Sequence, residues 1–216
     1  TVRDLSVAEV GAVLDQAADV KKNPGAYRKA LDGKTLAMIF QKPSLRTRVT
    51  FEAGMTQLGG HAIYMSPSEV GLGVRESVAD VARNLERWVD GIMARVFAHK
   101  LVEDLAAHAR VPVINGLSDD FHPVQALSDM QTIKETAGTF KGIKLAYVGD
   151  GNNMTHSLLE AGARTGVSVS AATPAGYEPR ADIVAWAAEA GRQTGCVVDV
   201  SHDIARAVKG AHFIYT

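Results

Sequence analysis

The sequence predicts an α/β protein made of two doubly wound parallel-sheet domains joined by a long helix. Short apolar runs without helical period alternate with amphipathic segments along the whole chain, which is typical of parallel sheets covered on both faces. The 216 residues can form one large or two small domains, and no repeat of a solenoid period interrupts them. A long helix over 121–136 separates the two series, so the predicted domains are 1–137 and 138–216.

The first domain is predicted from four apolar runs and the helical segments between them. Strands are expected over 35–40, 61–65, 91–97 and 111–117. Helices are expected over 5–20, 26–31, 44–58, 76–89, 101–109 and 121–136. The segment 66–75 is rich in Ser, Pro and Gly and is expected to be a loop, long enough to move or to reach a neighbouring chain.

The second domain repeats the alternation. Strands are expected over 143–148, 167–172, 196–200 and 212–215, and helices over 154–165, 180–194 and 203–208. Between the first strand and the first helix stands Gly149-Asp150-Gly151-Asn152-Asn153, a polar turn rich in glycine.

Composition narrows the class of protein. A net charge of −1 and a pI near 6.6 give no reason to expect a nucleic acid or an anionic membrane as partner. The single cysteine, Cys196, cannot form an internal disulfide or a cysteine-only metal site, and its apolar run predicts a small buried side chain. No apolar run approaches ~20 residues and no signal peptide opens the chain, so we expect a soluble cytoplasmic protein.

The segment between the first strand and the following helix is the strongest candidate site. Pro43 and Ser44 are helix-entry signals, and the first helical turn leaves backbone N–H groups unpaired. With the helix dipole, the hydroxyls of Ser44 and Thr47 and the guanidinium groups of Arg46 and Arg48, these donors predict a phosphate site. The alternative is that both arginines are solvated helix residues.

Other polar residues are expected at the same edge of the predicted sheets. In such folds ligands bind outside the carboxyl ends of the strands. Arg95 lies near the end of one strand, His122 and Gln125 follow the next, and Asn152 and Asn153 follow the first strand of the second domain. The alternatives are a structural ion pair for Arg95 and a capping or packing role for His122.

These segments resemble the carbamoyltransferases. Residues 42–48 look like the Ser-Thr-Arg-Thr-Arg signature of that family, and residues 121–125 are similar to its His-Pro-x-Gln motif. The runs Gly73–Ser77 with Asp80, Ala94–Phe97 and Gly149–Asn153 with Ser157 resemble the ornithine branch, and the resemblance covers essentially the whole chain.

The resemblance implies transfer of the carbamoyl group of carbamoyl phosphate to the δ-amine of L-ornithine, without a metal or cofactor, in a homotrimer. It assigns carbamoyl phosphate binding to Ser44, Leu45, Arg46, Thr47, Arg95, His122 and Gln125. It implies that the catalytic residues are Arg46, Thr47, Arg95 and His122. It implies that Asn153 binds ornithine.

Three departures from the family pattern accompany the resemblance. Leu45 stands where a Thr is usual, and Gly71 stands where family trimers use a Gln or His of a neighbouring subunit to reach the phosphate. The family continues with an Asp, a Ser-Met-Gly loop and a His-Cys-Leu-Pro motif, so we expect this chain to lack the family's C-terminal third and the second domain to be incomplete.

Three other functions stay open at this point. The acceptor could be aspartate or an N-acylornithine, and the chain could bind carbamoyl phosphate without turnover. Alternatively, Gly149-Asp150-Gly151 could belong to a dinucleotide-binding module, although the last glycine of the G-x-G-x-x-G fingerprint is missing.

Overall fold

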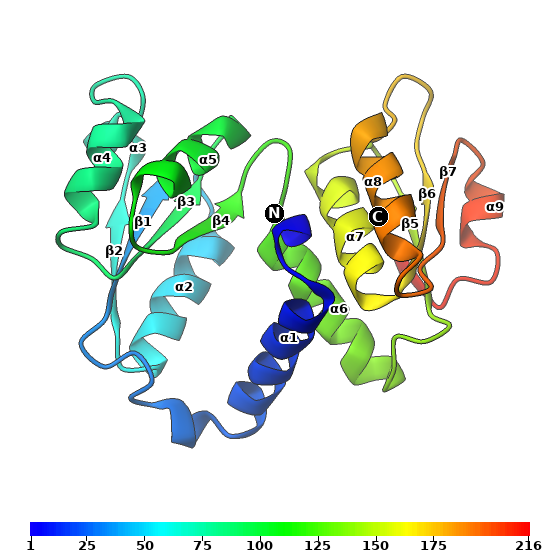
Figure 1. Cartoon of the computed structure of the whole chain (residues 1–216), viewed down its shortest axis with the longest axis horizontal. Helices are drawn as coiled ribbons and strands as arrows, with labels where there is room; N and C mark the ends of the chain where they lie inside the picture. Colours follow the sequence, from blue (N-terminus) through cyan, green and yellow to red (C-terminus); the bar gives the residue numbers. More distant parts are fainter. The chain divides into compact units, whose positions relative to one another are not determined.

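The computed structural model describes residues 1–216 and divides them into two compact units (Figure 1). One unit comprises residues 19–119, and the other comprises residues 1–18 together with 120–216. Each contains a four-stranded parallel sheet, with strand orders β2-β1-β3-β4 and β7-β6-β5-β8. The predicted fold class is confirmed.

The unit 19–119 alternates strands with helices. Its strands are β1 (Thr35–Phe40), β2 (His61–Met65), β3 (Gly91–Arg95) and β4 (Val113–Leu117). Its helices are η2 (Pro24–Tyr27, 3-10), α2 (Leu45–Gln57), α3 (Pro67–Val70), α4 (Val78–Leu85) and α5 (His99–His108).

Strand β1 is buried on both faces, as its unbroken apolar sequence predicts. Leu36, Met38 and Phe40 pack with residues of α2 on one face of the sheet. Ala37 and Ile39 point the other way and pack under α4 and α5. Because side chains alternate along a strand, a continuous apolar run can serve two helical layers at once.

The second unit has the same alternation. Its strands are β5 (Lys144–Val148), β6 (Ser168–Ala172), β7 (Val198–Ser201) and β8 (Phe213–Tyr215). Its helices are η1 (Val2–Asp4, 3-10), α1 (Val7–Lys22, whose first twelve residues belong to this unit), α6 (Pro123–Ala137), α7 (Asn153–Thr165), α8 (Ala181–Gly191) and α9 (Ile204–Val208).

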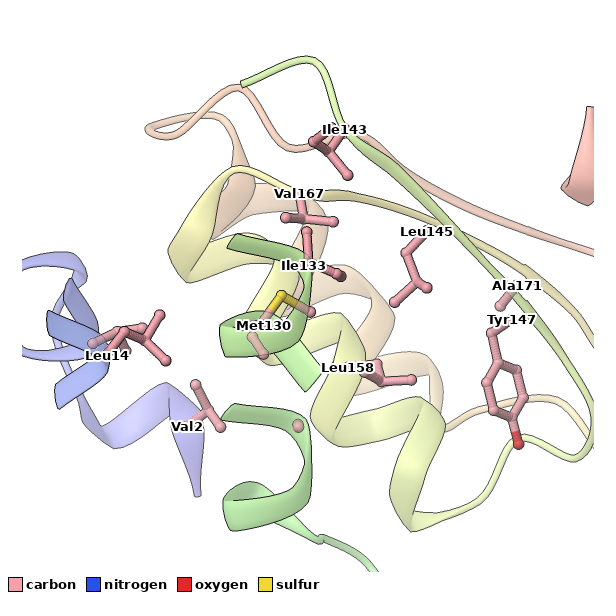
Figure 2. Packing of buried hydrophobic residues seen from close by; sticks show 13 residues of the cluster. Val2, Leu14, Met130, Ile133, Ile143, Leu145, Tyr147, Leu158, Val167 and Ala171 are labelled. Atoms are coloured by element: carbon pink, nitrogen blue, oxygen red, sulfur yellow. The ribbon is translucent and has the colours of Figure 1, made fainter. Parts of the chain in front are cut away.

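The core of this unit forms where α6 and α7 meet the sheet (Figure 2). Met130 and Ile133 of α6 and Leu158 of α7 pack against sheet residues such as Leu145. Val2, Val10 and Leu14 from the start of the chain complete the cluster. The N-terminal segment therefore packs with the second sheet, and the boundary between compact units does not coincide with the predicted domain boundary at 137/138.

The structure corrects three local expectations. The segment 66–75 is not a plain loop: it contains α3, and Val70 and Leu72 are buried in the core. The expected helix over 26–31 is a 3-10 turn at 24–27 followed by turns. The helix expected over 76–89 covers only 78–85, because the chain turns at 86–88 and leaves the large side chain of Trp88 in solvent.

No helix has both the length and the apolar character needed to cross a bilayer.

Candidate functional site

The order of strands in the unit 19–119 points to one end of its sheet. From β1 the chain moves to β2 on one side and then returns to place β3 on the other. At such a switch point the connections leave in opposite directions and open a crevice at the carboxyl ends of the two strands. Here these ends are the turn 41–44 after β1 and Arg95, the last residue of β3.

Ser44 begins α2 and shapes the turn. Its backbone is extended (φ −156°, ψ 114°), and its Oγ accepts the backbone N–H of Thr47 at 3.4 Å. The same hydroxyl donates to Thr47 Oγ1 at 3.1 Å. Leu45 contributes backbone alone, because its side chain is 80% exposed. The predicted strand-to-helix turn is confirmed, with the positive end of α2 at the edge of the sheet.

Arg95 reaches this turn without a carboxylate partner. Its guanidinium donates to Thr47 Oγ1 at 3.3 Å, and its buried Nε has no hydrogen-bond partner. Burial, and secondarily the charge of Arg46, lower the pKa of Arg95. A half-buried cation that faces hydroxyls and a second cation is an environment that favours a bound anion. The structure therefore does not contain the structural ion pair that was the alternative role for Arg95.

The remaining cations separate into two kinds. Arg48 is held by its own surroundings: Nε lies 2.9 Å from Glu52 Oε1, and the guanidinium stacks over the ring of Tyr64 at 3.9 Å. Lys42 pairs with Asp119. Arg46, by contrast, is exposed and makes no ion pair or hydrogen bond through its side chain. The spacing of four residues between Arg48 and Glu52 was the sequence signal that separates the two arginines.

The other predicted residues lie in the second unit and are described within it. His122 precedes α6, and its backbone N–H donates to Ser157 Oγ at 2.7 Å. Gln125, in the first turn of α6, donates through Nε2 to Asp129 Oδ1 at 2.9 Å. Burial raises the pKa of Asp129. Asp129 was not among the predicted residues; its spacing of four from Gln125 was the available signal.

His156 holds two loops of this unit together. Its Nδ1 lies 2.9 Å from the carbonyl oxygen of Asp120, and its Nε2 accepts the backbone N–H of Arg180 at 3.1 Å. These partners require a proton on Nδ1 and none on Nε2. Burial lowers the pKa of His156, consistent with the neutral ring. Sequence pattern gave no signal for this role.

The turn after β5 is used mainly to start α7. Asn152 caps the helix, its Oδ1 accepting the backbone N–H groups of Met154 and Thr155 at 2.9 and 3.4 Å. Asn153 is the first residue of α7 and is half-buried. A Cβ on Gly151 would lie 2.1 Å from the backbone nitrogen of Pro179, so glycine is needed here for the backbone at Pro179 to pass close by. The space left by the missing side chain is therefore filled by the protein and does not accommodate a pyrophosphate.

Gly71 and Cys196 each have a structural explanation. Gly71 ends α3 with φ of 53°, and a Cβ there would lie 2.8 Å from Arg75 Cβ, so the turn itself requires glycine. Cys196 is buried as predicted, and burial raises the pKa of its thiol to about 11. A thiol in that state is a poor nucleophile.

Comparison with known proteins supplies the family. Residues 1–135 match the model of the aspartate/ornithine carbamoyltransferase carbamoyl-P binding domain, and residues 141–216 match that of the Asp/Orn binding domain. The chain is 52% identical to ornithine carbamoyltransferase of Pyrococcus horikoshii over 217 residues, covering all of this chain and 68% of that protein. It is 50% identical to the enzyme of the same name from Bacillus thuringiensis, with the same coverage.

Solved structures agree with these sequences. Ornithine carbamoyltransferase from Pyrococcus furiosus superposes with a TM-score of 0.97 at 50% identity, covering the whole of this chain and 70% of that one. The enzyme from Thermus thermophilus gives 0.88 at 49% identity, covering 98% and 70%. With both family models, these identities and this coverage in agreement, the chain belongs to the aspartate/ornithine carbamoyltransferase family.

Proposed function

We propose that this chain is an enzyme that binds carbamoyl phosphate and transfers its carbamoyl group to the δ-amine of L-ornithine, giving L-citrulline and phosphate. Family membership and relatives named ornithine carbamoyltransferase at about 50% identity support the reaction. The observation that carries the proposal is Arg95, a half-buried guanidinium beside Thr47 that no carboxylate neutralises. An anion of the size of a phosphate ester would complete its surroundings.

The phosphate group binds at the start of α2. The backbone N–H groups of Leu45 and Arg46 are the unpaired donors of the first helical turn, because that of Thr47 is bound by Ser44 Oγ, and Leu45 contributes in this way alone. Ser44 and Thr47 supply hydroxyls. Arg46 supplies a charge that no protein carboxylate competes for, which lets it close on the ligand at little cost in lost contacts.

Within the unit 19–119, Thr47 and Arg95 polarise the carbamoyl group, and the family resemblance assigns the same role to His122. Attack of the neutral δ-amine on the carbonyl carbon puts negative charge on the carbonyl oxygen. The C–O bond to phosphate breaks as that charge collapses, and the proton that the amine loses is balanced by the released hydrogen phosphate. Preorganised donors aimed at this oxygen stabilise the transition state more than the substrate. Gln125 binds the carbamoyl amide, and Asn153 binds the backbone groups of ornithine. Holding both substrates in place supplies much of the remaining rate enhancement.

Assembly and location belong to the same proposal. We infer a homotrimer from the family resemblance of residues 42–48 and 121–125, and a cytoplasmic enzyme from the sequence composition. Sedimentation of the purified full-length protein tests the first inference: a single species of three chains is expected, and a stable monomer would contradict it.

The test of the function is citrulline formation from carbamoyl phosphate and L-ornithine by the full-length protein. Aspartate and N-acetylornithine serve as parallel acceptors under identical conditions. We expect turnover with ornithine and at most a small fraction of that rate with the other two. A preference for either alternative acceptor would change the substrate, and tight carbamoyl phosphate binding without any product would make the chain a binding protein.

A further inference from the structure

The amide of Gln125 is held in one orientation. Its Nε2 donates to Oδ1 of Asp129, one helical turn further along α6, at 2.9 Å. A carboxylate can only accept hydrogen bonds, so the amino end of the amide must face Asp129. The carbonyl oxygen, Oε1, then points away from that partner. It makes no hydrogen bond within the protein, and the Gln125 side chain is exposed.

The position of the Asp129 carboxylate costs folding free energy. Its second oxygen, Oδ2, is buried and has no hydrogen-bond partner. Burial raises the pKa of this carboxyl, and burial, with the charge of Asp129 as a second cause, raises the pKa of the neighbouring Tyr215. A solvated Gln–Asp pair would need none of this burial. A buried polar atom left unsatisfied in a native structure calls for an explanation.

We propose that Asp129 is a positioning residue that fixes the orientation of the Gln125 amide. In this orientation Gln125 Oε1 accepts a hydrogen bond from the amino group of the carbamoyl substrate. This inference rests on the proposed function, in which Gln125 binds that amide. Without Asp129 the amide can rotate by half a turn and present an NH₂ donor, which opposes the donor on the substrate. Asp129 thus selects between two orientations of nearly equal shape.

A consequence for specificity follows from the chemistry of the substrate. Acetyl phosphate has the same phosphate and carbonyl groups as carbamoyl phosphate, with a methyl group in place of the amino group. An acceptor fixed at Oε1 favours the carbamoyl compound, because acetyl phosphate leaves that oxygen unpaired. Asp129 should therefore affect discrimination between the two acyl phosphates and leave inorganic phosphate binding alone.

The same helix offers a matched control. Gln131 donates through Nε2 to Glu135 Oε1 at 3.2 Å, again with a spacing of four residues. This second pair lies two turns from the start of α6, away from Gln125. Substitution of Glu135 changes the charge of the helix as substitution of Asp129 does, and it leaves the Gln125 amide untouched.

The experiment compares Asp129→Asn, Asp129→Leu and Glu135→Gln in the full-length enzyme. The measured quantities are the KM of carbamoyl phosphate in citrulline formation and the inhibition constants of acetyl phosphate and inorganic phosphate. We expect Asp129→Leu, which removes the acceptor, to raise the KM of carbamoyl phosphate by about twofold to tenfold, between the cost of a free choice of two orientations and that of one lost hydrogen bond. Asp129→Asn can hold the amide in either orientation and should raise it less. The two inhibition constants should be unchanged in both. Glu135→Gln should alter none of the three.

Two further readouts separate positioning from a structural role. In a Gln125→Ala background, Asp129→Asn should have no additional effect on the KM of carbamoyl phosphate. The melting temperature of Asp129→Asn should equal or exceed that of the parent, because the substitution removes a buried charge. Unchanged discrimination in both Asp129 variants, or equal weakening of all three ligands, overturns the inference. A parent enzyme that forms no citrulline would instead overturn the proposed function.

Discussion

The carboxyl edges of the two sheets differ in how completely their polar side chains are hydrogen-bonded or ion-paired within the protein. In the unit 19–119, Arg46 and Arg95 have no carboxylate partner, and the buried Nε of Arg95 is unsatisfied. In the other unit, the polar groups after β5 and at the start of α6 are bound to the chain itself, through Asn152, Tyr147, His156 and Ser157. The first edge leaves a buried guanidinium nitrogen without a partner, whereas at the second most of these groups are bound within the chain, with Asp129 Oδ2 as an exception.

The contrast has a consequence for mutagenesis. A charge without a protein partner does not stabilise the fold, and burying it costs free energy, so its removal should weaken binding and catalysis without lowering stability. A side chain that satisfies a buried backbone group contributes to the fold, so its removal should lower stability. Four experiments test this difference.

Replacement of Arg95 by Met should have the largest effect. The variant keeps the aliphatic stem and loses the guanidinium that faces Thr47. We expect kcat/KM for citrulline formation to fall by about 10²–10³-fold, the loss typical of one oxyanion donor. The midpoint of urea unfolding should not fall. A variant with parental kinetics would remove Arg95 from the site, and a large loss of stability would make it a structural residue.

Arg46→Ala and Arg48→Ala form a matched pair on one helix. Loss of Arg46 should weaken carbamoyl phosphate and inorganic phosphate binding by about 1.5–3 kcal/mol, the range for a charge-assisted bond, with the fold intact. Arg48 is already engaged by Glu52 and Tyr64, so its loss should cost about 0.5–1 kcal/mol of stability and leave both affinities nearly unchanged. Titration calorimetry distinguishes them. Equal weakening by both would indicate a diffuse field and not a ligand contact.

Ser157→Ala tests the edge of the second unit, where polar groups are hydrogen-bonded within the chain. Ser157 is fully buried, and its hydroxyl accepts the backbone N–H of His122, which the variant leaves without that partner. We expect a loss of about 1–3 kcal/mol in the free energy of unfolding. Ser128→Ala is the control, because that exposed hydroxyl only bonds back to Val124 O within α6; it should change stability by less than about 0.5 kcal/mol. Equal urea midpoints for the two variants would contradict the comparison.

The smallest effect is a pH dependence from His156. Burial depresses the pKa of this ring in the folded state below its unfolded value near 6.5, so the unfolded chain binds more protons below that pH. Stability from His156 is therefore present above pH 6.5 and is lost as the pH falls, with a slope of at most about 1.4 kcal/mol per pH unit. His156→Gln can keep an acceptor for Arg180 and does not titrate. Unfolding curves at pH 7.5, 6.5 and 5.5 should converge for parent and variant as the pH falls, and parallel curves would exclude the ring as the source.

Much of the fold follows from local sequence. The unbroken apolar run of β1 and the alternation of strands with helices required parallel sheets with two helical layers, and both sheets are present. The turn at Ser44 was predictable because Pro and Ser have intrinsic preferences for helix starts. Errors arose where local preference is weak: the segment 66–75 is polar on average, yet two of its apolar side chains, Val70 and Leu72, anchor it in the core.

The sequence by itself determined the fold class, the helix start at Ser44 and the family motifs, because each depends on neighbours a few residues apart. Tertiary structure alone decided which charges are neutralised. Glu52, four residues after Arg48, is visible in the sequence, but the stacking of Arg48 over Tyr64, from β2, is not. The absence of a partner for Arg95, the pairing of His122 with Ser157 and the burial of Asp129 Oδ2 likewise depend on what packs nearby. Electrostatic and desolvation energies depend on distance in space, which residue order along the chain does not encode.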